Sequence, residues 1–155
     1  MRTFDSLAEL EHVVGQEVAV GDWVAIDQKR VDRFADATDD HQWIHVDPDR
    51  AKKGPFGGPI AHGFLTLSML PHLMAESIEI RNTVLGVNYG LNKVRFPAPV
   101  PVGSRVRGRF KLLSMEKLAP QMGFPGAQLV WEVTIEREGS DKPVCVAESV
   151  ARRYG

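Results

Sequence analysis

Cysteine is almost absent from this chain, because Cys145 is the only one among its 155 residues. An internal disulfide is therefore excluded, and a lone thiol suits a reducing compartment, so we expect a cytoplasmic protein. Cys145 lies in an apolar run of the sequence. That position favours a buried structural thiol over a nucleophile.

An excess of either charge is also missing, since 19 basic and 20 acidic residues give a net charge of -1. The sequence therefore offers no electrostatic reason to expect nucleic acid or an anionic membrane as a partner. The first six residues lack the apolar core of a signal peptide. The most apolar stretch, residues 60–78, is interrupted by polar side chains and is not expected to span a membrane. These are His62, Thr66, Ser68, His72 and Glu76.

Hydrophobic residues make up 43% of the chain, and no internal repeat or low-complexity linker divides it. A chain of this length buries roughly 70% of the surface that its unfolded form exposes. We therefore expect a single domain over residues 1–155.

The first half of the sequence predicts helices. Residues 6–14 could form a short amphipathic helix, and residues 23–26 a short strand. Asp27 can cap a helix that ends near Asp39, because apolar residues follow it at helical spacing. Residues 60–78 predict one long helix buried on nearly all sides and bent by Pro71.

The second half alternates with the period of strands. Residues 85–96 change phase at Asn92–Lys93, which indicates a bulge. Further strands follow over residues 105–112, 129–136 and 144–154, the last two joined by a turn at 139–141. Helices followed by consecutive strands predict an α+β fold, with an antiparallel sheet covering the long helix.

One strand carries a basic stripe formed by Arg105, Arg107, Arg109 and Lys111. Such side chains can hold the phosphates of an anionic ligand. The alternative is a solvated strand face balanced by Glu132 and Glu136 on the neighbouring strand. The pattern favours the solvated face.

Asp40 and His45 form the first candidate pair for chemistry, because proton transfer requires a carboxylate and an imidazole held together. Five residues apart, they point in different directions on a helix and to opposite faces on a strand. They can converge only across a turn, which the end of the preceding helix and Pro48 make plausible. The alternative is that Asp39 or Asp40 caps a helix and His45 packs in the core.

A metal centre is the competing interpretation, because His41, His45, His62 and Asp47 are all ligand types. The sequence contains neither a zincin motif nor a cysteine pair, so no metal is expected. His72 falls in the long helix, where we expect a core or interface histidine.

Gly63 is the candidate for binding a carbonyl oxygen, since it stands at the expected start of the long helix. Free N–H groups at a helix start favour a developing negative charge, and glycine lets a ligand approach the backbone. The alternative is a glycine needed for tight packing at the helix entry.

Two segments, 34–48 and 51–63, together resemble the hydratase-2 motif of the MaoC-like family of (R)-specific enoyl-CoA hydratases. The signal is Asp40 and His45 followed by His62–Gly63, and the resemblance extends over nearly the whole chain. Residues 89–97 and 101–103 are similar to the nodulation-protein-N-like branch.

This resemblance implies a hot-dog fold, a dimer with an acyl tunnel near the subunit interface, Asp40 and His45 as the catalytic pair, and a Gly63 amide that binds the thioester carbonyl. Asp39 stands where many relatives have glycine. Pro71 stands about where some hydratases have a serine that supports the aspartate. Supporting roles are therefore possible for His62, Asn88, Tyr89 and Asn92.

The implied activity is reversible addition of water to a trans-2-enoyl-CoA, giving an (R)-3-hydroxyacyl-CoA. It needs no cofactor, since CoA belongs to the acyl-CoA thioester substrate. A 3-hydroxyacyl-ACP dehydratase, a thioesterase and a non-catalytic acyl-CoA-binding subunit are the alternatives. A thioesterase is disfavoured, because its acid usually comes from the long helix and Glu76 lies far from Gly63 in sequence.

Overall fold

The computed structural model describes all residues from Met1 to Gly155. The helices are the 3-10 helix η1 (Leu7–Val13), α1 (Gln28–Thr38), α2 (Trp43–Val46), α3 (Pro48–Lys52), α4 (Gly63–Ser68) and α5 (Leu70–Ala75). The strands are β1 (Arg2–Phe4), β2 (Glu17–Val20), β3 (Val24–Ala25), β4 (Ile78–Ile80), β5 (Leu85–Arg95), β6 (Arg105–Gln121), β7 (Phe124–Arg137) and β8 (Cys145–Tyr154).

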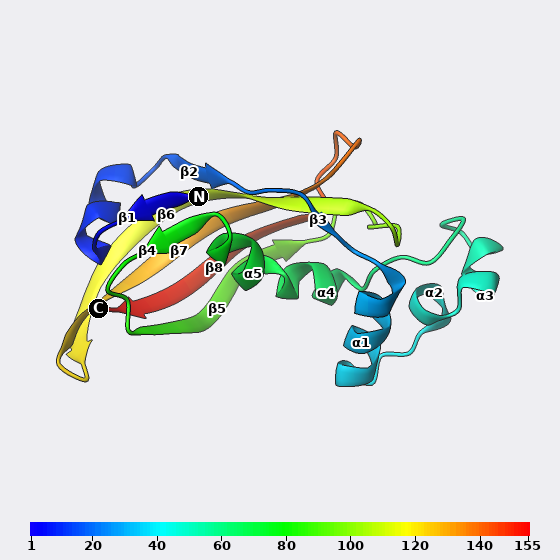
Figure 1. Cartoon of the computed structure of the whole chain (residues 1–155), viewed down its shortest axis with the longest axis horizontal. Coiled ribbons are helices and arrows are strands. Elements are labelled where there is room, and N and C mark those ends of the chain that lie inside the picture. Colours follow the sequence, from blue (N-terminus) through cyan, green and yellow to red (C-terminus); the bar gives the residue numbers. More distant parts are fainter.

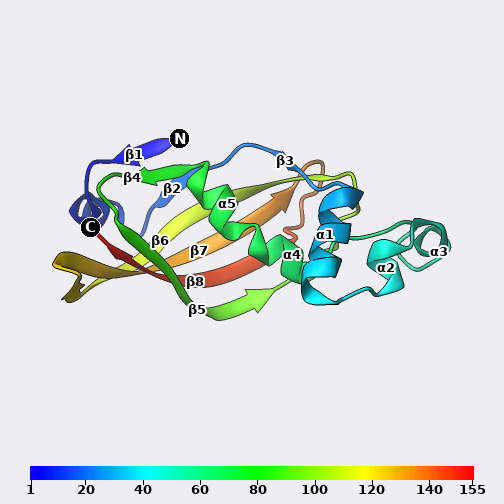
Figure 2. The ribbon, with the colours of Figure 1, turned by 60° about the horizontal axis from the view of Figure 1, so that its bottom comes forward.

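An antiparallel sheet in the order β2-β6-β7-β8-β5 curves around α4 and α5, with β3 paired to β6 (Figures 1 and 2). The helices α1, α2 and α3 project beyond one end of the sheet (Figure 1). A sheet wrapped around a central helix is the hot-dog arrangement, so the predicted fold class is confirmed.

Side chains along β6, next to β7 in the sheet, alternate between a buried face and an outward face. Val106, Phe110 and Leu112 on β6 are completely buried, while the arginines between them face outward. Three of the four basic residues form ion pairs with acids, namely Arg105–Glu138, Arg107–Glu136 and Arg109–Glu17. The stripe is therefore a solvated face with its own counter-charges, as the sequence favoured.

The long central helix differs from its prediction in length and continuity. Residues 60–62 precede it, Ile78 belongs to β4, and a turn at Met69 divides the helix into α4 and α5. Pro71 is the second residue of α5, and its ring nitrogen cannot donate the hydrogen bond that would continue α4. Met69 keeps a right-handed helical conformation and accepts a hydrogen bond from the Leu73 N–H at 2.9 Å, so the helix is interrupted at one residue and not fully broken.

The prediction that this helix is covered on nearly all sides was wrong for a single chain. The sheet covers one side only, which buries Leu65, Leu70 and Leu73, whereas Phe64 is 67% exposed. His72 is also exposed and so is not a core histidine within one chain. The sheet of one chain therefore does not account for the apolar outer side of this helix.

Strand β5 lies at the edge of the sheet, and nearly all of its residues are exposed. Its pairing with β8 shifts between Leu91 and Lys93, which confirms the predicted bulge, and shifts again between Asn88 and Gly90. The segment 117–127 extends the β6–β7 hairpin beyond the predicted strands and turns at Met122–Gly123.

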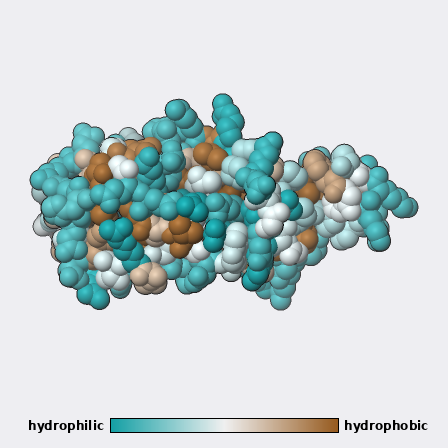
Figure 3. Space-filling view, turned by 90° about the horizontal axis from the view of Figure 1, so that it is seen from above, coloured by the Kyte–Doolittle hydropathy of each residue, from teal (hydrophilic) through white to brown (hydrophobic).

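Cys145 opens β8 and is fully buried, as predicted for a structural thiol. Loss of solvation raises the pKa of this thiol to about 11. None of the helices has the length and apolarity needed to cross a membrane. Seen from above, hydrophilic side chains surround separate hydrophobic patches (Figure 3).

Candidate active site

The conformation at the two ends of helix α1 determines where Asp40 lies. Asp27 caps its start by accepting a hydrogen bond from the Arg30 N–H at 2.8 Å, as predicted. At its other end Asp39 adopts the left-handed conformation, with φ 59° and ψ 22°. Glycine is the usual residue at such a helix end, and aspartate tolerates it better than most. The residue at position 39 therefore turns the chain so that Asp40 leaves the helix.

His45 lies on the single-turn helix α2 and is 6% exposed. Its Nδ1 lies 2.7 Å from the carbonyl oxygen of Ile60. A carbonyl only accepts, so Nδ1 carries the proton and donates it, and Nε2 keeps a free lone pair. Burial, followed by proximity to His62, lowers the pKa of His45, against the opposing effects of the Ile60 carbonyl and Asp40. The ring is therefore neutral at pH 7.

His62 links the two predicted catalytic residues. It is 2% exposed, and its ring stacks on that of His45 with the centroids 3.8 Å apart. Its Nε2 donates to the backbone carbonyl of Asp40 at 2.9 Å and lies 3.9 Å from that residue's Oδ2. Its Nδ1 is buried without a partner. The structure thus gives His62 a direct contact with both residues.

One potential ligand atom from each of Asp40, His45 and His62 lies within 4.8 Å of the other two. Imidazole binds a metal through lone pairs in the plane of the ring. Here the two ring planes are stacked at only 24°, so their lone pairs do not converge on one ion. The geometry favours a proton-transfer site over a metal centre.

The other proposed metal ligands face elsewhere. The exposed His41 is hydrogen bonded to Asp36 at 3.0 Å, and this bond raises the pKa of His41. The carboxylate of Asp47 caps α3 by accepting from the Arg50 N–H at 3.0 Å. Neither side chain belongs to the Asp40–His45–His62 cluster.

Gly63 is the first residue of α4, so its N–H has no carbonyl partner within the helix. A Cβ at this position would lie 2.9 Å from the Phe96 ring. The packing role and the carbonyl-binding role of Gly63 therefore both have a structural basis, because the residue packs tightly and also leaves its amide open. With six residues, α4 has only a weak dipole, so the free N–H carries the argument.

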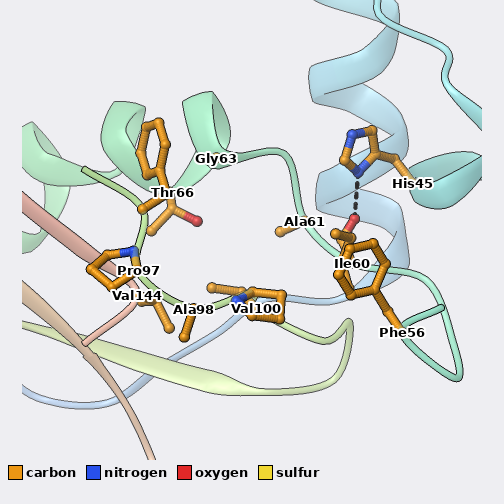
Figure 4. A pocket seen from close by; sticks show the side chains of 12 residues that line it. His45, Phe56, Ile60, Ala61, Gly63, Thr66, Pro97, Ala98, Val100 and Val144 are labelled. Atoms are coloured by element: carbon orange, nitrogen blue, oxygen red, sulfur yellow. Dashed lines mark hydrogen bonds between the residues drawn. The ribbon is translucent and has the colours of Figure 1, made fainter. Parts of the chain in front are cut away.

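A cavity of about 310 Å³ lies between His45 and Gly63 (Figure 4). The segment from Phe96 to Val100 forms much of its apolar wall, and Asp40 does not line it. Thr66 was missed from the sequence, although it stands three residues after Gly63 and so shares its helix face. Its hydroxyl points into the cavity (Figure 4).

The predicted supporting asparagines lie on β5 and contact none of the three clustered residues. Asn88 lines a separate cavity beside Ser68 and Pro71, and Asn92 donates a hydrogen bond to Glu148 at 3.4 Å. Tyr89 packs beneath the guanidinium of Arg152. Within one chain, His62 is therefore the only predicted supporting residue that touches Asp40.

The hot-dog fold thus places a carboxylate, a neutral imidazole and an open backbone amide near one apolar cavity. The sequence model of the MaoC like domain matches residues 9–142, and the chain belongs to this family of dehydratases and hydratases.

Its relatives agree with this assignment. The chain is 55% identical over 152 residues to 3-hydroxyacyl-thioester dehydratase Z of Mycobacterium tuberculosis, covering 98% of each protein. It is 47% identical over 147 residues to Nodulation protein N of Rhizobium leguminosarum bv. viciae, covering 92% of this chain and 87% of that protein. The fold matches the MaoC-like dehydratase from Rhodospirillum rubrum with a TM-score of 0.72 and 18% identity, covering 96% of each chain.

Proposed function

We propose that this protein is an (R)-specific enoyl-CoA hydratase that adds water reversibly and with syn geometry to trans-2-enoyl-CoA, giving (R)-3-hydroxyacyl-CoA. The proposal depends chiefly on one observation, namely that Asp40 and His45 offer a carboxylate oxygen and an imidazole nitrogen within 4.8 Å of each other. A water molecule that makes two hydrogen bonds of about 2.8 Å spans roughly 4.6 Å at a tetrahedral angle. The limit of 4.8 Å is compatible with one water held between the two groups.

In this mechanism the Asp40 carboxylate and His45 Nε2 both accept hydrogen bonds from the reacting water. One of the two groups removes a proton from the water as its oxygen attacks C3, and that same proton is then delivered to C2 on the same face. His45 fits this role because its Nδ1–H is held by Ile60 and its ring is neutral at pH 7.

As the C3–O bond forms, negative charge develops on the thioester oxygen. The free N–H of Gly63 would stabilise it, an interaction worth roughly 3–4 kcal/mol in other enzymes. The 310 Å³ cavity between Gly63 and His45 gives space for the reacting part of the acyl chain. CoA is part of the substrate, and the reaction requires no further cofactor.

We further propose that the protein acts as a homodimer. The edge strand β5 leaves its backbone unpaired and exposes Val87, Tyr89 and Leu91. Pairing with β5 of a second copy would satisfy this edge and cover the exposed apolar side of α4, including Phe64. Sedimentation velocity tests this directly, since a monomer at micromolar concentration would contradict it. The buried, unpaired Cys145 supports a cytosolic location.

Two other functions use the same features. A 3-hydroxyacyl-ACP dehydratase would share the chemistry and differ in how the carrier is bound. A non-catalytic acyl-CoA-binding subunit would not require a neutral imidazole fixed beside a carboxylate, so the geometry favours an enzyme.

Crotonyl-CoA distinguishes these functions. Purified protein is mixed with it while the enoyl-thioester absorbance and free thiol are followed. Absorbance lost without thiol release supports the hydratase, and thiol release indicates a thioesterase. If turnover is absent with crotonyl-CoA and with longer enoyl-CoA substrates, the hydratase proposal fails. Crotonyl-ACP as a second substrate identifies the preferred carrier.

The site assignment has its own test. We expect Asp40→Ala and His45→Ala each to lower kcat at least about 100-fold while the fold is kept. His41→Ala is the matched control, because this neighbouring imidazole is exposed and bonded to Asp36. Near-wild-type turnover by either active-site variant would overturn the assignment.

A further inference from the structure

A further cavity, of about 150 Å³, lies between α5 and the concave side of the sheet. Arg153, near the end of β8, reaches into it. This half-buried guanidinium forms no hydrogen bond or ion pair with any residue of the chain. Lost solvation lowers the pKa of Arg153, as expected for a cation without a counter-charge.

The residue opposite Arg153 in the sheet leaves space for its side chain. Gly86 is its partner on β5, and a Cβ at that glycine would collide with the Nη1 of Arg153. The glycine thus provides the space in which the guanidinium lies. Arg152 shows the contrast, because its side chain donates to Gln128 at 3.1 Å and covers Tyr89.

A second polar group faces the same cavity without a partner. The Oγ1 of Thr83 is buried and makes no hydrogen bond. Both polar groups can donate hydrogen bonds, and no acidic residue lines the cavity. The remaining wall is apolar and includes Met74, Ile78 and Trp131. Donors in the wall of an otherwise apolar cavity match an anionic group on an aliphatic chain.

We propose that this cavity is a binding site for a carboxylate carried by a short aliphatic chain. Arg153 holds the carboxylate through its fork of N–H groups, Thr83 donates one further hydrogen bond, and the chain lies between α5 and Trp131. A planar guanidinium matches the two oxygens of a carboxylate. The volume corresponds to about five water molecules, which limits the enclosed part of the ligand to a few carbon atoms.

Two molecules present this chemistry. One is a free short-chain carboxylate. The other is an acyl thioester with a carboxylate at its far end, and this source depends on the proposed function. Met74 stands eight residues after Thr66, roughly 12 Å along helical backbone, so only a long acyl chain could join the two cavities.

Calorimetric titration with hexanoate tests the site. We expect saturable binding to wild type and to the control Arg152→Gln, at least tenfold weaker binding to Arg153→Met, and about threefold weaker binding to Thr83→Val. Hexanamide, which has no charge, should bind at least tenfold more weakly than hexanoate. Absence of hexanoate binding to wild type, or equal affinity in wild type and Arg153→Met, would overturn the proposal.

Folding of the variants is checked in the same samples by thermal unfolding. Ligand present at a large excess over its Kd raises the Tm of a protein that binds it. Hexanoate should therefore raise the Tm of wild type and Arg152→Gln but not that of Arg153→Met. A rise of equal size in all three proteins contradicts a site at Arg153.

Turnover of two long enoyl-CoA substrates identifies the source. They have the same length, and one has a terminal carboxylate. If Arg153→Met lowers kcat/KM at least tenfold for the carboxylated substrate alone, the site reads the end of the acyl chain. If kcat/KM stays unchanged for both substrates while hexanoate binding is lost, the site binds a free carboxylate. If neither substrate reacts, the proposed function fails, and the titration still decides the carboxylate site.

Discussion

The imidazole rings of His45 and His62 are stacked, with centroids 3.8 Å apart and planes inclined by 24°. This contact fixes His45 from one side while the Ile60 carbonyl fixes it from another. The same His62 ring donates to the Asp40 backbone. One buried residue thus positions both members of the proposed catalytic pair.

We predict that His62→Ala destabilises the protein by about 2–4 kcal/mol and lowers kcat about tenfold. The destabilisation follows from a cavity left by a buried ring, and the lost activity from the freedom gained by His45 and Asp40. Urea unfolding and crotonyl-CoA hydration measure the two effects. His62→Phe keeps an aromatic ring and loses the hydrogen bond, and the exposed His72→Ala serves as control. Unchanged kcat in His62→Ala would remove its positioning role.

Gly63→Ala tests the open amide. The added methyl group would meet the Phe96 ring at 2.9 Å, so we expect a loss of about 1–3 kcal/mol in stability and at least a tenfold loss in kcat/KM. Combining it with Phe96→Leu relieves the contact. Stability should then recover while activity stays low, since the methyl group still obstructs the approach to the N–H. Recovery of both would mean that the glycine serves packing alone.

The lowered pKa of His45 predicts a loss of stability in acid. In the unfolded chain this histidine takes up a proton near its ordinary pKa of 6.5, whereas the folded protein binds it only at lower pH. Between the two pKa values the unfolded state binds more protons, so stability falls as the pH drops below about 6.5. Hydration activity should fall at lower pH, where His45 becomes charged in the fold. Urea unfolding of wild type and His45→Gln between pH 5 and 8 isolates this contribution. Identical slopes would contradict it.

Asp39→Gly should stabilise the protein by about 0.5–1 kcal/mol. Residue 39 has a positive φ, and glycine adopts that conformation without the Cβ penalty. Urea unfolding provides the measurement, with Asp36→Gly inside α1 as a matched control that should be destabilising. A destabilised Asp39→Gly would show that the aspartate side chain has a structural role of its own.

Features determined by neighbouring residues could be predicted from the sequence. The Asp27 cap, the alternation along β6 and the β5 bulge each depend on a few consecutive side chains. Asp40 and His45 were candidates from their residue types, but their catalytic roles came from a resemblance, since their spacing alone required only a turn.

Features formed by distant segments were missed. The strands β1 and β4 have three residues each and pair across more than seventy positions, so neither shows an alternating pattern. The central helix ends before Ile78, because Ile78 pairs with Arg2 as part of β4. The stack of His45 on His62 and the cavity at Arg153 likewise join separate elements, and no local pattern records them.

Because the Cys145 thiol is unreactive, the native protein gives no signal of its own in an assay that counts released thiol. A reagent that counts free CoA reacts with thiolates, and a pKa of about 11 leaves roughly one thiol in ten thousand ionised at pH 7, on a side chain that is fully buried. The native protein therefore contributes no background to thioester cleavage. The same thiol becomes countable when the sheet unfolds, so one colorimetric readout reports both hydrolysis and the integrity of the enzyme.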